Sequence, residues 1–167
     1  ERGVPFYVVK HLQREVRPLK DLRALRHVLR QLRRFRPDLL TLHNSKSGIL
    51  GRIAAKMLGI PVLYTAHGWQ FALEVPPTKR RMFRAFETVG AQLGDGIITV
   101  CEQDRTFALN YRGFRPANIH TIHNAMPDVP PELRADPSVD PPRFIMVART
   151  APQKDHPTLL QAMSGLT

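Results

Sequence analysis

Short apolar runs alternate with amphipathic helical patterns along most of this 167-residue chain. The runs are too short for helices and are bounded by glycine, proline or polar residues, which is typical of buried strands. Strands that alternate with helices predict a parallel sheet joined by right-handed crossovers. The sequence therefore predicts an α/β fold, with a Rossmann-like parallel sheet flanked by helices. We expect strands at residues 6–9, 39–42, 62–64, 96–100, 119–122 and 144–148, and helices at residues 18–36, 49–58, 78–93, 103–111 and 157–163.

A proline-rich stretch divides the chain into two parts. Six prolines punctuate residues 127–142, where apolar periodicity is weak, and this composition is typical of a linker. We expect residues 1–126 to form one domain and residues 143–167 to begin a second one. The chain starts almost at its first expected strand and stops within a helical pattern, so we interpret it as an interior piece of a longer protein.

Basic residues outnumber acidic ones, 25 to 14, which gives a formal net charge of +11. A surface this basic suits anionic lipid, nucleic acid or phosphorylated ligands, and it does not decide the fold. The single cysteine, Cys101, excludes an internal disulfide and favours a reducing compartment. No apolar run approaches the roughly 20 residues that span a bilayer.

Much of the charge lies on the helix expected at residues 18–36. Its leucines recur at spacings of three and four, which indicates one buried face, and its arginines lie largely off that stripe. We predict that these arginines attract anionic lipid, and an ordinary solvated outer face is the alternative. Nucleic-acid binding is disfavoured because few aromatic residues accompany the arginines to stack on bases. The arginines are Arg23, Arg26, Arg30, Arg33 and Arg34.

His67 and Gly68 come just past the expected strand at residues 62–64. In open α/β sheets, ligands bind outside the carboxyl ends of the strands. Gly68 allows a sharp turn of the backbone or the close approach of a ligand. The position of His67 therefore indicates a binding site, and a core histidine beside a buried Trp69 is the alternative.

Two further strand-to-helix turns carry cations. Ser45 and Lys46 lie where a helix begins, and the free N–H groups there favour an anion; a plain N-cap with a solvated lysine is the alternative. The turn is not a Walker loop, because the glycine-rich lead-in is missing. Arg149 and Lys154 follow the strand expected at residues 144–148, and two cations at such a turn suit a diphosphate.

No metal site is expected from the sequence. His120 and His123 have a suitable spacing, but no acidic residue or cysteine accompanies them. Nothing indicates a serine or cysteine nucleophile, and Cys101 is interpreted as a small, partly buried filler.

Five segments, taken in order, resemble the family 4 retaining glycosyltransferases, which have the two-domain GT-B fold. Each motif alone is moderately specific, and together they cover nearly the whole chain. The fifth resembles the opening of the family's donor domain. The segments are residues 43–52 (HNSKSGILGR), 64–69 (YTAHGW), 97–102 (IITVCE), 122–125 (IHNA) and 147–154 (VARTAPQK).

The resemblance implies a role for each candidate residue. His67 would lie near the transferred sugar as the catalytic residue, orienting a hydroxyl or supporting developing charge. Arg149 and Lys154 would hold the donor diphosphate and help the nucleotide leave. Asn124 would line the cleft on the donor side. Ser45, Lys46 and Gly68 would be acceptor-side residues.

The resemblance also implies what the chain lacks. Residues 1–126 would be an acceptor-side Rossmann-like domain without its first strand and glycine-rich loop. Residues from 143 on would be an incomplete nucleotide-sugar domain, without the family's acidic pair. Cys101 and Ala125 stand where serine and glycine are more usual.

The implied function is transfer of a sugar from a nucleotide diphosphate-sugar, with retention, to a lipid-linked or polysaccharide acceptor. No metal or other cofactor is expected. The setting would be polysaccharide assembly at the cytoplasmic face of a membrane, with an anionic membrane surface as a partner. A binding-only acceptor domain and a GT-B nucleotide-sugar epimerase remain as alternatives.

Overall fold

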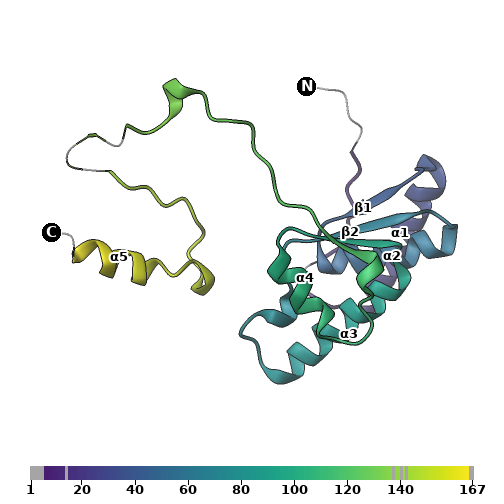
Figure 1. Ribbon diagram of the computed structural model, residues 1–167. Coiled ribbons are helices and arrows are strands. Elements are labelled where there is room, and N and C mark those ends of the chain that lie inside the picture. The colour runs from purple at the N-terminus through teal and green to yellow at the C-terminus, as the bar shows by residue number, and fades with distance from the viewer. Residues whose placement is uncertain (1–5, 14, 137, 140, 142, 166–167) are drawn as a thin grey trace. The chain divides into compact units, whose positions relative to one another are not determined.

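The computed structural model describes residues 6–13, 15–136, 138–139, 141 and 143–165 (Figure 1). The chain divides into two compact units, Glu1–Ala125 and Met126–Thr167. The boundary lies one residue before the one expected from the proline-rich composition.

A four-stranded parallel sheet forms the centre of the first unit. Its strands are β1 (Leu40–Leu42), β2 (Val62–Ala66), β3 (Gly96–Thr99) and β4 (Ile119–Thr121), and they lie in the order β1-β2-β3-β4. Leu40 pairs with Val62, and Ile97 of β3 pairs with both Tyr64 and Ile119. The parallel α/β architecture is therefore confirmed.

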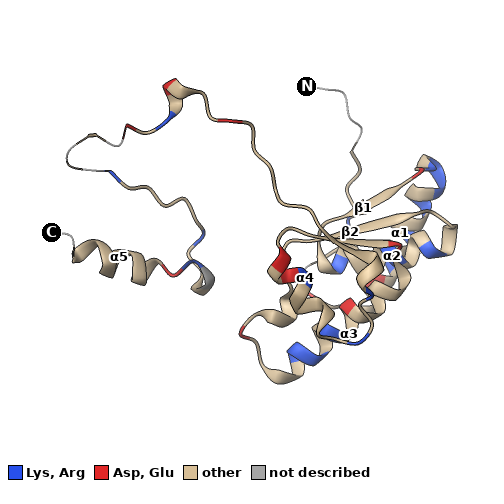
Figure 2. Cartoon of the chain, viewed as in Figure 1, with Lys and Arg blue, Asp and Glu red and all other residues tan. Residues whose placement is uncertain are grey.

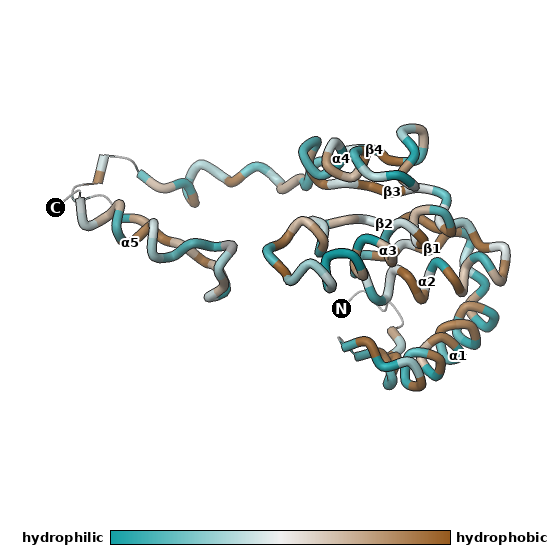
Figure 3. Tube along the Cα trace, turned by 90° about the horizontal axis from the view of Figure 1, so that it is seen from below, coloured by the Kyte–Doolittle hydropathy of each residue, from teal (hydrophilic) through white to brown (hydrophobic). Residues whose placement is uncertain are grey.

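Four helices accompany this sheet: α1 (Pro18–Phe35), α2 (Ser45–Leu58), α3 (Pro77–Leu93) and α4 (Glu102–Leu109). The strands lie in chain order and are parallel, and crossovers between parallel strands are right-handed as a rule, which puts α2, α3 and α4 on one face of the sheet. Figures 1 and 3 show this layer, with α1 beside α2 at the β1 end. Short 3₁₀ turns, Gln70–Ala72 and Pro116–Asn118, complete the connections.

Local signals in the sequence set the helix ends. Pro18 occupies the first position of α1, where a missing N–H costs nothing. Arg36 ends the helix in the left-handed conformation and donates its N–H to the carbonyl of Leu32. Gly59 ends α2 in the same way, at φ 67°. At its start, α2 begins four residues earlier than expected, because Asn44 caps it.

The core lies between the sheet and the helices. Along β2, Val62, Tyr64 and Ala66 are buried and the residues between them are half-buried, which is the alternation of a strand with one face covered. A cluster of aromatic rings continues the core beyond β2: Trp69, Phe71 and Phe114 have ring centroids 5.3–6.4 Å apart.

Two strand predictions are wrong. Residues 6–9 and 144–148 belong to no strand. A strand is stable only when a neighbour completes its backbone hydrogen bonds, and within the described residues neither segment has one. The second unit instead contains the 3₁₀ turns Pro131–Leu133 and Pro152–Lys154 and the helix α5 (His156–Ser164).

From the sequence, α3 is an amphipathic helix whose apolar residues, Met82, Phe83, Phe86 and Val89, predict its buried face, and this prediction is partly wrong. Met82, Phe86 and Val89 are exposed, whereas Glu87 and Gly90 are buried. None of the described helices combines the length and the apolar character needed to span a bilayer.

Candidate functional site

Three of the polar residues selected from the sequence, Ser45, Lys46 and His67, lie just past the carboxyl ends of strands of the sheet. Parallel strands end at the same edge, which we call the carboxyl rim, and ligands bind there in open α/β sheets. The loops that leave this rim begin at His43, His67, Val100 and Ile122.

Two histidines meet on the rim. The Nδ1 atom of His43 lies 3.2 Å from Nε2 of His67, and the two rings are stacked with centroids 5.5 Å apart. Both side chains are exposed, so the alternative of a core histidine at position 67 is wrong. One ring nitrogen must donate and the other accept, so the contact holds while at least one imidazole is neutral. The second nitrogen of each ring has no hydrogen-bond partner among the described residues.

The loop that carries His67 is anchored in the core by the residues that follow it. Gly68 has φ 105°, a conformation that other residues rarely adopt, and it turns the chain out of β2. Trp69 is buried and donates its indole N–H to the carbonyl of Asp104 at 2.9 Å. Phe71 is buried against the same aromatic cluster. His67 therefore faces solvent from a loop whose next residues belong to the core.

The start of α2 lies beside the histidines. Asn44 accepts a hydrogen bond from the backbone N–H of Lys46 at 3.0 Å and so caps the helix. The Ser45 hydroxyl lies 3.4 Å from that of Tyr64. The Lys46 ammonium lies 2.7 Å from Oδ1 of Asp21 and donates to the carbonyl of Glu15, so it links α2 to the first turn of α1.

The Asn44 cap gives a modest test of this turn. Asn44→Ala should lower the free energy of unfolding by about 1 kcal/mol, because one N–H at the start of α2 loses its partner. Asn124→Ala is the control, since Asn124 is exposed and caps no helix. Urea unfolding of both variants checks this, and equal stabilities would contradict it.

A buried polar network supports the rim from inside. Arg52 and Glu87 form an ion pair at 3.1 Å, with side chains only 1% and 3% exposed. Arg52 also donates to the carbonyl of Gly48, and its guanidinium lies 4.3 Å from the centre of the Tyr64 ring. The Tyr64 hydroxyl donates to Glu87 at 3.3 Å. Tyr64 thus joins the ion pair to Ser45 on the rim.

Burial is the main cause that raises the pKa of Tyr64 to about 12, and the negative charge of the nearby Glu87 carboxylate is the second cause. In the unfolded chain this phenol ionises near pH 10, so between about pH 10 and 12 the folded state holds a proton that the unfolded state has lost. The stability contributed by the neutral phenol is therefore complete below pH 10 and is lost as pH rises towards 12.

Tyr64→Phe tests this pH dependence. The wild-type free energy of unfolding should fall by roughly 1.4 kcal/mol per pH unit more than that of the variant across this window. Lysine titration in this pH range contributes equally to both proteins, so it cancels in the difference between their free energies of unfolding. Chemical unfolding at several pH values measures it, and parallel curves would contradict the assignment.

A second polar cluster lies at the β3–β4 end of the rim. Glu102 accepts from the Thr121 hydroxyl at 2.6 Å and pairs with Arg105 at 2.9 Å. The hydrogen bond from Thr121, and then that from Arg105, lowers the pKa of the Glu102 carboxyl. Cys101 is half-buried and donates its thiol to Asp104 at 3.4 Å, consistent with the filler role expected for it.

The remaining predicted residues are exposed. Asn124 lies three residues past the end of β4. Arg149 and Lys154 belong to the second unit, and Lys154 ends the 3₁₀ turn before α5. Asp155 caps α5 by accepting from the N–H of Thr158. Among the described residues, no three His, Cys, Asp or Glu side chains gather closely enough to hold a metal ion.

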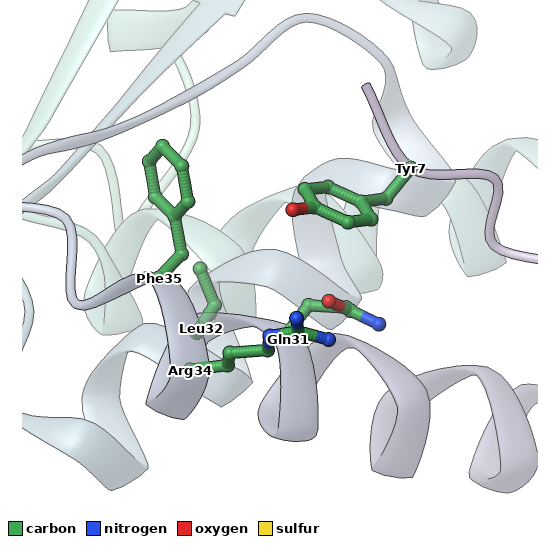
Figure 4. A pocket seen from close by; sticks show the side chains of 5 residues that line it. All are labelled: Tyr7, Gln31, Leu32, Arg34 and Phe35. Carbon is green, nitrogen blue, oxygen red and sulfur yellow. The ribbon is translucent and has the colours of Figure 1, made fainter. Parts of the chain in front are cut away.

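A hollow elsewhere in the first unit shares no residue with the rim. It lies between Tyr7 and the last turns of α1, and Figure 4 shows the Tyr7 ring across from the helix. Its lining residues are Tyr7, Gln31, Leu32, Arg34 and Phe35.

Sequence reasoning missed His43, Arg52 and Glu87 as site residues. His43 follows an expected strand just as His67 does, so the same argument applied to residues 39–42 finds it. Arg52 is flanked on its helix face by Gly48 and Ala55, which leave room for a buried guanidinium. Glu87 is four residues from the half-buried Phe83, so it lies on the covered face of α3.

Comparison with known proteins places these observations in context. Residues 1–125 match the family model described as "Glycosyl transferase 4-like domain". A relative in Escherichia coli, "UDP-Gal:alpha-D-GlcNAc-diphosphoundecaprenol alpha-1,3-galactosyltransferase", is 28% identical over 125 residues, which are 74% of this chain and 32% of the relative. "Putative glycosyltransferase EpsD" of Bacillus subtilis (strain 168) is 30% identical over 108 residues, which are 62% of this chain and 28% of that protein.

The chain thus spans about a third of the length of the curated relatives it matches. A solved structure, that of a "putative UDP-N-acetylglucosamine 2-epimerase" from Listeria monocytogenes, aligns with a TM-score of 0.47 and 16% identity. The alignment covers 60% of this chain and 26% of that one.

Proposed function

The chain belongs to the glycosyl transferase 4-like family, and we propose that the whole protein transfers a sugar, with retention, from a nucleotide diphosphate-sugar to a lipid-linked or polysaccharide acceptor. The family membership supports the class of reaction. The observation on which we base the choice of residues is the exposed His43–His67 pair on the carboxyl rim.

The rim suits the chemistry of sugar transfer. The bond between the anomeric carbon and the donor diphosphate breaks, the acceptor oxygen bonds to that carbon, and the hydroxyl proton passes to the departing diphosphate or to solvent. His67 offers a ring nitrogen to a sugar hydroxyl or to developing charge, and His43 fixes the orientation of the ring. The buried Trp69, hydrogen-bonded to Asp104, anchors the loop that carries His67.

Donor binding is assigned to Arg149, Lys154 and Asn124. The first two are exposed cations at a turn that precedes α5. A guanidinium fork and an ammonium together stabilise the charge that develops on a departing diphosphate. Asn124 supplies amide hydrogen bonds from the loop after β4.

Acceptor binding is assigned to Ser45, Lys46 and Gly68. The E. coli relative is named for an acceptor that carries a diphosphate on a lipid, and an acceptor of that chemical class suits this turn. Ser45 lies two residues after His43, Gly68 directly follows His67, and Lys46 is a cation at the same turn that pairs with Asp21. We place the protein at the cytoplasmic face of the membrane on the same grounds.

The test is a transfer assay with the whole protein. It is incubated with a panel of nucleotide diphosphate-sugars and lipid diphosphate acceptors, and release of nucleotide and formation of the glycosylated lipid are measured. We expect transfer from at least one donor, with the anomeric configuration retained. Binding of donors without transfer would favour a binding-only domain, and epimerised donor without any glycosylated product would favour an epimerase; either result contradicts the proposal.

A further inference from the structure

The outer face of α1 concentrates positive charge that nothing in the described chain neutralises. Its arginines are all exposed, and within the described residues none of their side chains takes part in a hydrogen bond or an ion pair. Figure 2 shows the basic residues along this helix. The residues of this arginine face are Arg23, Arg26, Arg30, Arg33 and Arg34.

The helix geometry puts these side chains on one side. Ala24, Leu29 and Leu32 are the buried residues of α1, and the two leucines share a core cluster with Ala54 of α2 and Leu40 of β1. At 100° per residue the arginines fall on the opposite side of the helix. Like charges three and four residues apart repel each other, so this face is most stable when a partner supplies negative charge.

The single acidic residue of α1 is not available to the arginine face. Asp21 accepts from the backbone N–H of Arg17 at 2.9 Å and pairs with Lys46 at 2.7 Å. It therefore holds the first turn of α1 beside the carboxyl rim. The arginine face begins at Arg23, within one turn of that contact.

Apolar side chains accompany the charge at the rim end of the helix. Leu19 is 77% exposed and Leu22 is 46% exposed. Further along the helix, Arg26, Arg30 and Arg33 follow at spacings of four and three residues, so their guanidinium groups neighbour one another on its surface. Neighbouring guanidinium forks suit phosphodiester head groups, and exposed leucines suit the acyl boundary beneath them.

We propose that the outer face of α1 is a docking surface for an anionic lipid bilayer. The helix lies along the membrane surface, with the arginines at the level of the head groups and Leu19 and Leu22 at the acyl boundary. Duplex nucleic acid is the less favoured partner, because exposed leucines contribute nothing to phosphate contacts along a duplex.

This inference deepens the proposed function, because it brings the rim to the surface where a lipid-linked acceptor lies. Its test is independent of transfer, since the vesicles carry no glycolipid and no donor is added. Failure of membrane docking and failure of sugar transfer are therefore measured separately.

The experiment is sedimentation of the chain with sucrose-loaded vesicles. Phosphatidylcholine vesicles with and without phosphatidylglycerol are compared, at low and high salt. One variant replaces the five arginines of the arginine face with glutamine. The matched control makes the same change at five exposed arginines outside α1, so that both variants have the same net charge; these are Arg80, Arg81, Arg84, Arg112 and Arg115. Thermal unfolding confirms that both variants fold.

We expect binding that requires phosphatidylglycerol and weakens with salt. The α1 variant should lose on the order of a hundredfold or more in partition coefficient, whereas the control should lose about threefold or less. Leu19→Ser should weaken binding at high salt, where the apolar contribution remains.

Several results would overturn the proposal. Equal losses in the two quintuple variants would show that net charge alone attracts the chain. Equal binding to neutral vesicles would exclude the charge-based contact. Binding of a duplex oligonucleotide, without binding of anionic vesicles, would assign the face to nucleic acid.

Discussion

Replacing Glu87 with alanine should lower the free energy of unfolding by about 3–5 kcal/mol, the largest effect on stability that we expect from one substitution. Arg52 would remain in the core, 1% exposed, without its carboxylate partner. Its Nη1 atom already has no hydrogen-bond partner among the described residues, so the variant adds a second unsatisfied group. The Tyr64 hydroxyl would lose its acceptor as well.

The surroundings allow the guanidinium little room to move away. A Cβ atom placed on Gly90 would overlap it, so the backbone of α3 closes one side of the site. The Tyr64 ring, whose centre lies 4.3 Å from the guanidinium, closes another side. Tyr64 in turn packs so closely against Gly48 that a Cβ atom there would overlap its ring. We therefore expect Arg52 to stay buried in the variant rather than turn to solvent.

Two further variants separate the buried charge from the lost contacts. Glu87→Gln keeps the shape of the side chain and removes its charge, and it should be destabilising. The double variant Arg52→Met with Glu87→Leu removes both charges and should recover much of the lost stability, because neither charge then needs a partner. Equilibrium unfolding in urea measures all three, and a Glu87→Ala variant as stable as the wild type would contradict the pairing.

The second large effect is expected on activity. His67→Ala in the whole protein should lower kcat/KM for sugar transfer by about 10²–10³-fold, because an oriented polar group at the reacting sugar is lost. The free energy of unfolding should change little, since His67 is exposed and the loop is anchored by Trp69. Loss of activity without loss of stability separates a role in transfer from a role in folding.

His120→Ala is the matched control for this substitution. His120 is also an exposed histidine of the same sheet, and its side chain lies on β4 rather than in a loop of the rim. Its removal should leave kcat/KM within about threefold of the wild type. A similar loss in both variants would remove the support for His67 as the catalytic residue.

Much of the fold could be predicted because its signals are local. Pro18 and the left-handed Arg36, which precedes Pro37, bound α1 within one residue of the expected helix. The apolar run at residues 62–64 lies inside β2, and the turn after it places His67 on the rim as expected. Each of these features depends on residues close together in the sequence.

The failures depend on contacts between distant segments. Residues 6–9 have strand-forming side chains, but a strand is defined by its neighbour and not by its own composition. The stripe of Met82, Phe86 and Val89 is apolar, yet α3 buries Glu87 instead, because the Glu87 carboxylate pairs with Arg52 in the core. The two residues are 35 positions apart in the sequence. A single sequence gives no direct signal for such a pair.

The candidate site was predictable in part for the same reason. The rule that ligands bind at the ends of parallel strands selected His67 and Ser45, and in the structure both residues lie just past the end of a strand of the sheet. It did not reveal that His67 contacts His43 or that Tyr64 joins Ser45 to the buried ion pair. The assignments of Arg149, Lys154 and Asn124 stay predictions.

A crystal structure of the whole protein with an intact, unreactive analogue of its nucleotide-sugar donor tests the central claim most directly. We predict that the sugar lies at the carboxyl rim, with a ring nitrogen of His67 within hydrogen-bond distance of a sugar hydroxyl or of the transferred group. A donor bound with its sugar outside the reach of both His67 and His43 would contradict the claim.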